Sequence, residues 1–252
     1  MSIKEQFVAG TIAAQQFANS SSIAEMLSYP TKQLQRPVAP SEEKNKSSYF
    51  WDKLHSLGGI VPIGAFLVEH FFENSYALVS PGKFNYIAVR LETIPWRVPA
   101  EFLLIWLPIA FHGGYGCWIW WKSKSNSWQH PWLANWMFTF QRWSGMVVFA
   151  FIIWHVWIER FATHGKNSYA GVAHVFANPY YLGFYVIGVV AASFHLGNGI
   201  FQFLNKWGLA VTPRAQRVAG WFGFAVGLAF TVTGLFIVAG FAFDWHPFSG
   251  YL

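Results

Sequence analysis

Five long apolar stretches dominate the sequence of this 252-residue chain. Each has about 20 residues or more, which is long enough for a helix to cross a hydrocarbon core of roughly 30 Å. They run approximately over residues 57–77, 98–121, 137–161, 179–204 and 218–243. Because a backbone inside lipid must satisfy its own hydrogen bonds, these stretches predict an all-α integral membrane bundle of five transmembrane helices.

The composition agrees with a membrane location and excludes several other classes. Only 11% of the residues are charged, against about 25% in a typical soluble domain. The basic residues are scattered through the loops and form no stripe, so no nucleic-acid partner is expected. The single Cys117 cannot build an iron–sulfur cluster, a structural zinc site or a disulfide scaffold.

The chain divides into three parts by polarity. Residues 1–50 form a polar arm, expected to be soluble or interfacial and weakly helical near residues 3–17. Residues 51–243 form the five-helix membrane domain, and residues 244–252 form a short tail on the outer side. The connections are short and carry turn residues at 80–83, 122–127, 164–168 and 212–214.

The Lys and Arg residues indicate how the helices are oriented. With a cytoplasmic N-terminus, twelve of them lie in cytoplasmic segments and five in outer segments. Cytoplasmic loops of membrane proteins carry the excess of positive charge. The N-terminus is therefore predicted to be cytoplasmic.

Each of the first four apolar stretches contains one histidine: His70, His112, His155 and His195. A histidine deep in a membrane is a functional candidate, although a hydrogen bond to a neighbouring helix explains any single one equally well. At 1.5 Å per residue, His70 and His155 fall in the outer half, and the other two fall in the inner half. The two levels differ by roughly 10–15 Å. Unrelated structural histidines need not pair by depth.

Two imidazoles facing each other at one depth make the axial ligand set of a haem iron, because the porphyrin supplies four further nitrogens. A zinc ion bound by protein alone needs about four ligands at one level, and each level here offers two histidines. The sequence has no C-x-x-C-H motif for covalent attachment. The pattern predicts two haem b groups, an outer one on His70 and His155 and an inner one on His112 and His195.

The segments around these histidines resemble a known family. They are YFWDKLHSLGGIVPIGAFLVEH (49–70), LPIAFHGGYG (107–116), QRWSG followed by WHVWIER (141–160), LGFYVIGVVAASFHLGNGIFQF (182–203) and WGLAVTPRAQR (207–217). They are similar to the single-chain, dihaem cytochrome b subunit of succinate dehydrogenase and fumarate reductase complexes. The resemblance covers residues 49–243, and four histidine contexts match in order and spacing.

The resemblance implies a membrane anchor for a flavoprotein and an iron–sulfur protein in the prokaryotic inner membrane. Electrons would pass from the iron–sulfur partner to the inner haem, the outer haem and then a quinone, with menaquinone expected. The dicarboxylate chemistry of this tricarboxylic acid cycle and respiratory-chain enzyme would lie on the partners, so the chain is enzymatic only within its complex. The working direction, and whether complexes form trimers, stay open.

Polar residues near the two predicted haems are further candidates. Those at the inner face suit haem propionates, with anchoring by lipid headgroups as the alternative: Lys53, His55, Ser56 and Arg142. Towards the outer side, Glu101 and Glu73 are candidates to exchange protons with the quinone. The alternative for Glu101 is a carboxylate that stabilises a helix start. Four histidines lie in loops or the tail and are expected to be solvated or interfacial: His130, His164, His174 and His246.

Two other functions remain open at this point. The first is the cytochrome b of a different quinol oxidoreductase, although many of those place two ligands on one helix, whereas this chain has one deep histidine on each of four. The second is a haem-free transporter or proton channel that uses its histidines as a relay. A reduced-minus-oxidised absorption spectrum distinguishes them, because only a cytochrome shows b-type bands.

Overall fold

The computed structural model describes residues 46–162 and 168–250, and most of these residues are helical. Five helical spans are long and apolar enough to cross a membrane: Ser48–Leu78, Arg97–Lys122, Leu133–Ala162, Pro179–Lys206 and Pro213–Phe243. The predicted five-helix bundle is therefore confirmed. The predictions for residues 1–45 of the polar arm, and for His164, lie outside the described residues.

The first span consists of α3 (Lys46–Ile60), α4 (Pro62–Ser75) and the 3-10 turn η2 (Tyr76–Leu78). Proline lacks the backbone N–H that a helix interior requires, and Pro62 therefore stands at the first position of α4. The N–H of Val61 still donates to the carbonyl of Leu57 at 2.9 Å, so the chain continues across the junction in one direction.

The second and third spans each contain a π-helical turn. The second runs through α6 (Arg97–Glu101), the π turn η3 (Phe102–Trp106) and α7 (Leu107–Lys122); the third through α8 (Leu133–Val156) and the π turn η4 (Trp157–Ala162). Pro108 lies two residues after the end of η3, and its missing N–H accounts for the widened turn. π turns are rare in proteins overall, and those that occur are often found at functional sites.

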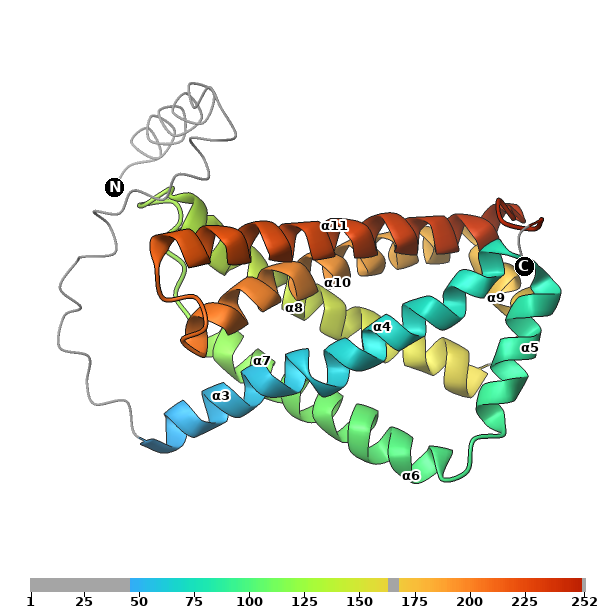
Figure 1. Cartoon of the computed structure of the whole chain (residues 1–252), viewed down its shortest axis with the longest axis horizontal. Helices are drawn as coiled ribbons and strands as arrows, with labels where there is room; N and C mark the ends of the chain where they lie inside the picture. The colour runs from blue at the N-terminus through green and yellow to red at the C-terminus, as the bar shows by residue number, and fades with distance from the viewer. Residues whose placement is uncertain (1–45, 163–167, 251–252) are drawn as a thin grey trace, which may run out of the picture.

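The fourth and fifth spans, α10 (Pro179–Lys206) and α11 (Pro213–Phe243), lie side by side along much of their length (Figure 1). Glycines permit this close approach. A Cβ on Gly223 would overlap the carbonyl of Gly197, and one on Gly227 would lie 3.1 Å from the carbonyl of Ser193. Small residues that allow main chains to touch are the usual means of packing helices in membranes.

Two short helices, α5 (Pro81–Glu92) and α9 (Tyr169–Phe176), lie between the spans where the sequence predicted turns alone. Each begins at a serine that caps it: Ser80 Oγ accepts from the N–H of Lys83, and Ser168 Oγ from that of Gly171. We call this side of the bundle the α5 end. The opposite side, where α3 begins and α7 and α10 end, is the α3 end (Figure 1).

Most of the buried apolar residues gather at the α5 end. A cluster under α5 and α9 includes Phe84, Phe176, Tyr185 and Phe241, each at most 7% exposed. Elsewhere large apolar side chains point outward, as Leu104 (61% exposed) and Phe224 (60% exposed) do. Such a surface would be an aggregation hazard in water, whereas in a bilayer it faces the lipid tails.

Candidate functional site

The structure brings the four intramembrane histidines together as two pairs. The rings of His70 on α4 and His155 on α8 have centres 5.8 Å apart, with planes 77° from parallel. The rings of His112 on α7 and His195 on α10 have centres 6.2 Å apart at 87°. The rise per residue of a helix had predicted that the same two histidines of each pair lie at one depth.

Hydrogen bonds orient three of the four imidazoles in the same way. His112 Nδ1 lies 2.9 Å from the carbonyl of His55. His195 Nδ1 lies 3.1 Å from the carbonyl of Gln141, and 3.2 Å from both Gln141 Nε2 and Ser144 Oγ. His155 Nδ1 lies 3.2 Å from the hydroxyl of Tyr185. Because each Nδ1 faces an oxygen acceptor, we assign the ring proton to Nδ1. The lone pair of each ring then lies on Nε2.

The fourth histidine, His70, has a weaker contact on the same nitrogen. Its Nδ1 lies 3.4 Å from Nδ2 of Asn74, one turn further along α4, and this amide donates to the His70 carbonyl at 2.8 Å. Within the residues that the structure describes, no hydrogen bond reaches Nε2 of any of the four rings. All four Nε2 atoms therefore remain available as ligands.

The geometry of both pairs fits a group with one iron between two imidazoles. With metal–nitrogen bonds of about 2 Å on opposite sides of one metal atom, two imidazole centres lie roughly 6 Å apart. The separations of 5.8 and 6.2 Å match this value. Across residues 46–162 and 168–250, no three His, Cys, Asp or Glu side chains gather to hold a metal ion by themselves.

Glycines leave room for the rings of the pair at the α3 end. A Cβ on Gly59 would overlap the ring of His112, and a Cβ on Gly145 would lie 2.9 Å from Cε1 of His195. Both contacts are closer than ordinary packing allows. These two positions therefore require the absence of a side chain for the imidazoles to lie where they do.

The candidate residues at the α3 end have different surroundings. The ring of His55 stacks on that of His112, with centres 4.1 Å apart and planes 4° from parallel. Lys53 donates to the carbonyl of Lys206 at 2.8 Å and lies over the ring of Trp207, so it stabilises the end of α10. Ser56 is half-buried on α3.

Arg142 points away from the histidine pair. Gln141 and Gly145 face His195, so Arg142 is turned about 100° from that side of α8. Its guanidinium donates to the carbonyl of Phe138 at 3.1 Å, and it lines a recess of about 340 Å³ beside Trp143. Its Nε is buried and has no hydrogen-bond partner among the described residues. The suggested role of Arg142 as a propionate ligand stays a prediction, and the neighbouring Gln141 is the residue that contacts His195.

The two carboxylates suggested for proton exchange lie on the side of the α5 end. Glu101 is 3.0 Å from Nη2 of Arg160 and 3.5 Å from Nε of Arg97, and its side chain is 20% exposed. Ion pairs with two arginines agree with a structural role as well as with a functional one. Glu73 is half-buried on α4.

Two functional candidates were missed by the sequence analysis. Tyr185, which bonds to His155, donates its hydroxyl proton to Oε1 of Glu159 at 2.7 Å. Gln141 donates to the carbonyl of His195 at 3.0 Å and is held in turn by Asn198, whose amide donates to it at 2.8 Å. Glu159 lies four residues after His155 in the sequence. This helical spacing is the one local signal that could have revealed Glu159 as a candidate.

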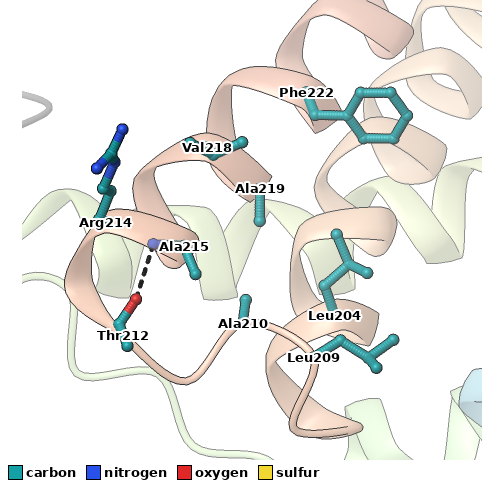
Figure 2. Close-up of a pocket in the computed structure, with 9 residues that line it drawn as sticks. All are labelled: Leu204, Leu209, Ala210, Thr212, Arg214, Ala215, Val218, Ala219 and Phe222. Atoms are coloured by element: carbon teal, nitrogen blue, oxygen red, sulfur yellow. Dashed lines mark hydrogen bonds between the residues drawn. The ribbon is translucent and has the colours of Figure 1, made fainter.

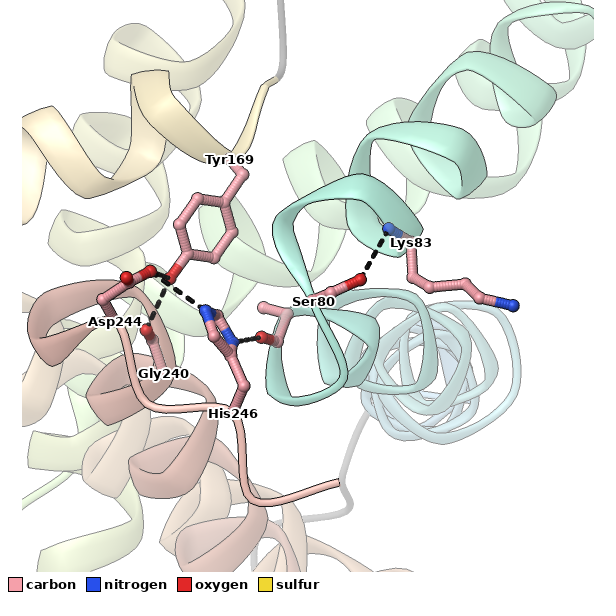
Figure 3. A network of polar contacts seen from close by, with 7 residues as sticks. Ser80, Lys83, Tyr169, Gly240, Asp244 and His246 are labelled. Atoms are coloured by element: carbon pink, nitrogen blue, oxygen red, sulfur yellow. Dashed lines mark hydrogen bonds and ion pairs between the residues drawn. The ribbon is translucent and has the colours of Figure 1, made fainter. Parts of the chain in front are cut away.

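A separate polar network closes the α5 end (Figure 3). The hydroxyl of Tyr169 donates to the carbonyl of Gly240 at 2.8 Å and to Asp244 at 3.0 Å, and His246 bridges Asp244 and the carbonyl of Ala77. Burial raises the pKa of Tyr169 to about 12. Hydrogen bonds from His246 and Tyr169 lower the pKa of Asp244. His246 was expected to be solvated or interfacial; in the structure both of its ring nitrogens bond to the protein.

An apolar recess of about 450 Å³ lies at the α3 end, beside the connection between α10 and α11. Leu204, Leu209 and Phe222 form part of its wall (Figure 2). At its edge, Thr212 Oγ1 accepts from the N–H of Ala215 at 3.1 Å and so caps the start of α11.

Two comparisons with known proteins bear on this arrangement. Residues 121–234 match the family described as succinate dehydrogenase/fumarate reductase transmembrane subunit. The chain is also 35% identical over 193 residues to the succinate dehydrogenase cytochrome b558 subunit of Bacillus subtilis (strain 168), a match that covers 76% of this chain and 95% of that protein.

Together with the fold, these similarities define the class of the protein, a multi-pass membrane cytochrome b of electron transport. The resemblance found around the histidines is confirmed. The chain belongs to the family of succinate dehydrogenase/fumarate reductase transmembrane subunits, as a cytochrome b membrane anchor.

Proposed function

We propose that this chain is the dihaem membrane anchor of a succinate:quinone oxidoreductase. His70 and His155 would hold the iron of one haem b, and His112 and His195 would hold that of a second. The observation that carries the proposal is the pair of ring separations, 5.8 and 6.2 Å, each between histidines of different spans. Haem b, when bound, supplies an iron that takes up and releases one electron at a time.

The residues of the chain prepare each imidazole for this task. Main-chain carbonyls of His55 and Gln141 hold the Nδ1 protons of His112 and His195, which keeps Nε2 directed to a metal. The stacked ring of His55 and the amide of Gln141 restrict rotation of the two rings. Preorganisation of this kind favours one geometry in both oxidation states.

The partners follow from the family. The chain anchors a flavoprotein and an iron–sulfur protein, and it delivers their electrons to a quinone, with menaquinone as the expected species. The iron–sulfur protein docks at the α3 end, where the excess of Lys and Arg supports a cytoplasmic surface. The protein is then a resident of a prokaryotic inner membrane with its N-terminus in the cytoplasm. Membership of this family supports this function over another quinol oxidoreductase or a histidine-relay transporter.

The quinone is reduced near the α5 end, and Glu101 and Glu73 are the candidates to supply its protons. The Glu101 carboxylate is held between Arg97 and Arg160, which places one acid and two cations in one part-buried group. In Glu101→Gln, quinone turnover is expected to fall while both haem spectra persist. Unchanged turnover would leave Glu101 with a structural role alone.

Spectra of the complex test the haem assignment. A reduced-minus-oxidised spectrum of the complex purified with its partners should contain b-type bands from two haems. His70→Ala should remove one of them, and His195→Ala should remove the other and cut succinate-to-quinone turnover. His174→Ala is the control, since His174 is exposed on α9 and should leave both haems in place. Two intact haems in either ligand variant would contradict the assignment.

A further inference from the structure

His155 differs from the other three paired histidines in what its Nδ1 contacts. His112 faces a main-chain carbonyl, and His70 faces the amide of Asn74. His195 faces the Gln141 carbonyl, the Gln141 side-chain amide and the hydroxyl of Ser144, and that hydroxyl donates to a main-chain carbonyl. His155 faces a phenol, and that phenol donates to a carboxylate: Nδ1 to Tyr185 Oη is 3.2 Å and Oη to Glu159 Oε1 is 2.7 Å. In the described part of the chain, this is the only one of the four rings linked to an acidic side chain through a single hydroxyl.

The hydroxyl of Tyr185 is held firmly in this position. Tyr185 is 5% exposed, and its ring packs against Phe176, Phe151 and His155 with centres 4.7, 5.4 and 5.6 Å apart. Phe151 is itself fixed, because it fills the space above Gly188, where a Cβ would overlap its ring. The phenol therefore cannot swing away from His155 without disturbing the buried cluster at the α5 end.

The carboxylate comes from an unusual piece of backbone. Glu159 lies in the π turn η4, four residues after His155 on the same span. Tyr185 comes from α10. The hydrogen bonds of Tyr185 on the fourth span therefore connect two residues of the third span, the proposed ligand His155 and the carboxylate of Glu159.

We propose that Tyr185 and Glu159 are positioning residues that set the electron-donating strength of His155. This inference rests on the proposed function, since it concerns the haem held by His70 and His155. An acceptor on the Nδ1 proton gives the ring more imidazolate character, which strengthens the bond from Nε2 to the metal and stabilises the ferric state. Tyr185 accepts this proton more strongly because its own hydroxyl donates to a carboxylate oxygen.

The test is a redox titration of both haems in the purified complex, followed by absorbance. In Tyr185→Phe, the equilibrium constant for reduction of the haem on His155 should rise about tenfold, a shift of about 59 mV for one electron. Glu159→Gln keeps the shape and an acceptor oxygen, so it should shift the same haem in the same direction by a smaller amount. The haem on His112 and His195 should keep its potential.

Tyr181→Phe is the matched control, because it removes a phenol hydroxyl from the same helix, where its ring packs on Trp154. It should shift neither potential. Two haems with unshifted potentials in Tyr185→Phe, or equal shifts of both haems, would overturn the inference. If Tyr185→Phe does not assemble, Glu159→Gln decides by the same criteria. A wild-type complex without b-type bands would instead overturn the proposed function, so the two failures are distinguishable.

Discussion

Gly58 and Gly59 are neighbours on the first span, and they differ in what an added methyl group would meet. A Cβ on Gly59 would overlap Cε1 of His112 and lie 2.9 Å from its Nδ1, whereas a Cβ on Gly58 has nothing within 4 Å. Carbon atoms in contact are about 3.5–4.0 Å apart. In Gly59→Ala, the ring of His112 must therefore move by about 1 Å.

The cost in stability is modest, and the cost at the ligand is larger. Alanine is favoured over glycine in a helix by about 1 kcal/mol, a gain that both variants share. Crowding a packed contact costs roughly 1–3 kcal/mol, which leaves Gly59→Ala destabilised by roughly 0–2 kcal/mol. Metal–ligand distances tolerate only about 0.2 Å. We therefore expect haem affinity at the His112–His195 pair to fall roughly tenfold or more.

Haem content per complex measures this effect. In the reduced-minus-oxidised spectrum of Gly59→Ala, the band that His195→Ala removes should be reduced, and the other band should keep its intensity. Gly58→Ala should keep both bands and assemble at least as well as the parent. Equal haem content in the two glycine variants would refute the reasoning, because it would show that the ring of His112 needs no bare backbone at residue 59.

Other expected outcomes concern helix packing and the α5 end. Gly223→Leu should lower the midpoint of thermal inactivation by several degrees, because the side chain would separate two main chains, while Gly183→Leu, with open surroundings, should not. The lowered pKa of Asp244 contributes stability above its unfolded pKa of about 3.9, and this contribution is lost as the pH falls through the folded pKa. Hydrogen exchange of the C-terminal tail should therefore rise as the pH falls through the folded pKa, and Asp244→Asn should remove that rise. The raised pKa of Tyr169 contributes stability below its unfolded pKa of about 10, and this is lost as the pH rises through about 12; Tyr169→Phe should abolish this alkaline transition, measured by the same exchange.

Sequence reasoning predicted the membrane spans well because length and hydropathy are local properties. It did not predict α5 and α9, since helices of 12 and 8 residues cannot span a bilayer and carry no long apolar periodicity. Their formation depends on the serine caps and on burial of Phe84 and Phe176 against the ends of the spans. Such burial is visible only once the spans are assembled.

The sequence predicted how deep each site residue lies along its helix, but not the direction in which its side chain points. Helical rise gave the partners of each histidine pair, because position along a helix axis follows from residue number. The direction of each side chain depends on how every helix is turned about its axis. For this reason the contact of Gln141 with His195 and the link from His155 through Tyr185 to Glu159 were not foreseen.

The π turn η3 has a consequence for protein engineering. A π turn holds one residue more than an α turn. The side chains before it are therefore rotated by about 100° about the helix axis, relative to the side chains after it. Deleting Leu104 would remove this extra residue and turn Glu101 away from Arg160, relative to the stretch that carries His112. A one-residue deletion is thus a way to decouple the two ends of the second span without touching any polar side chain.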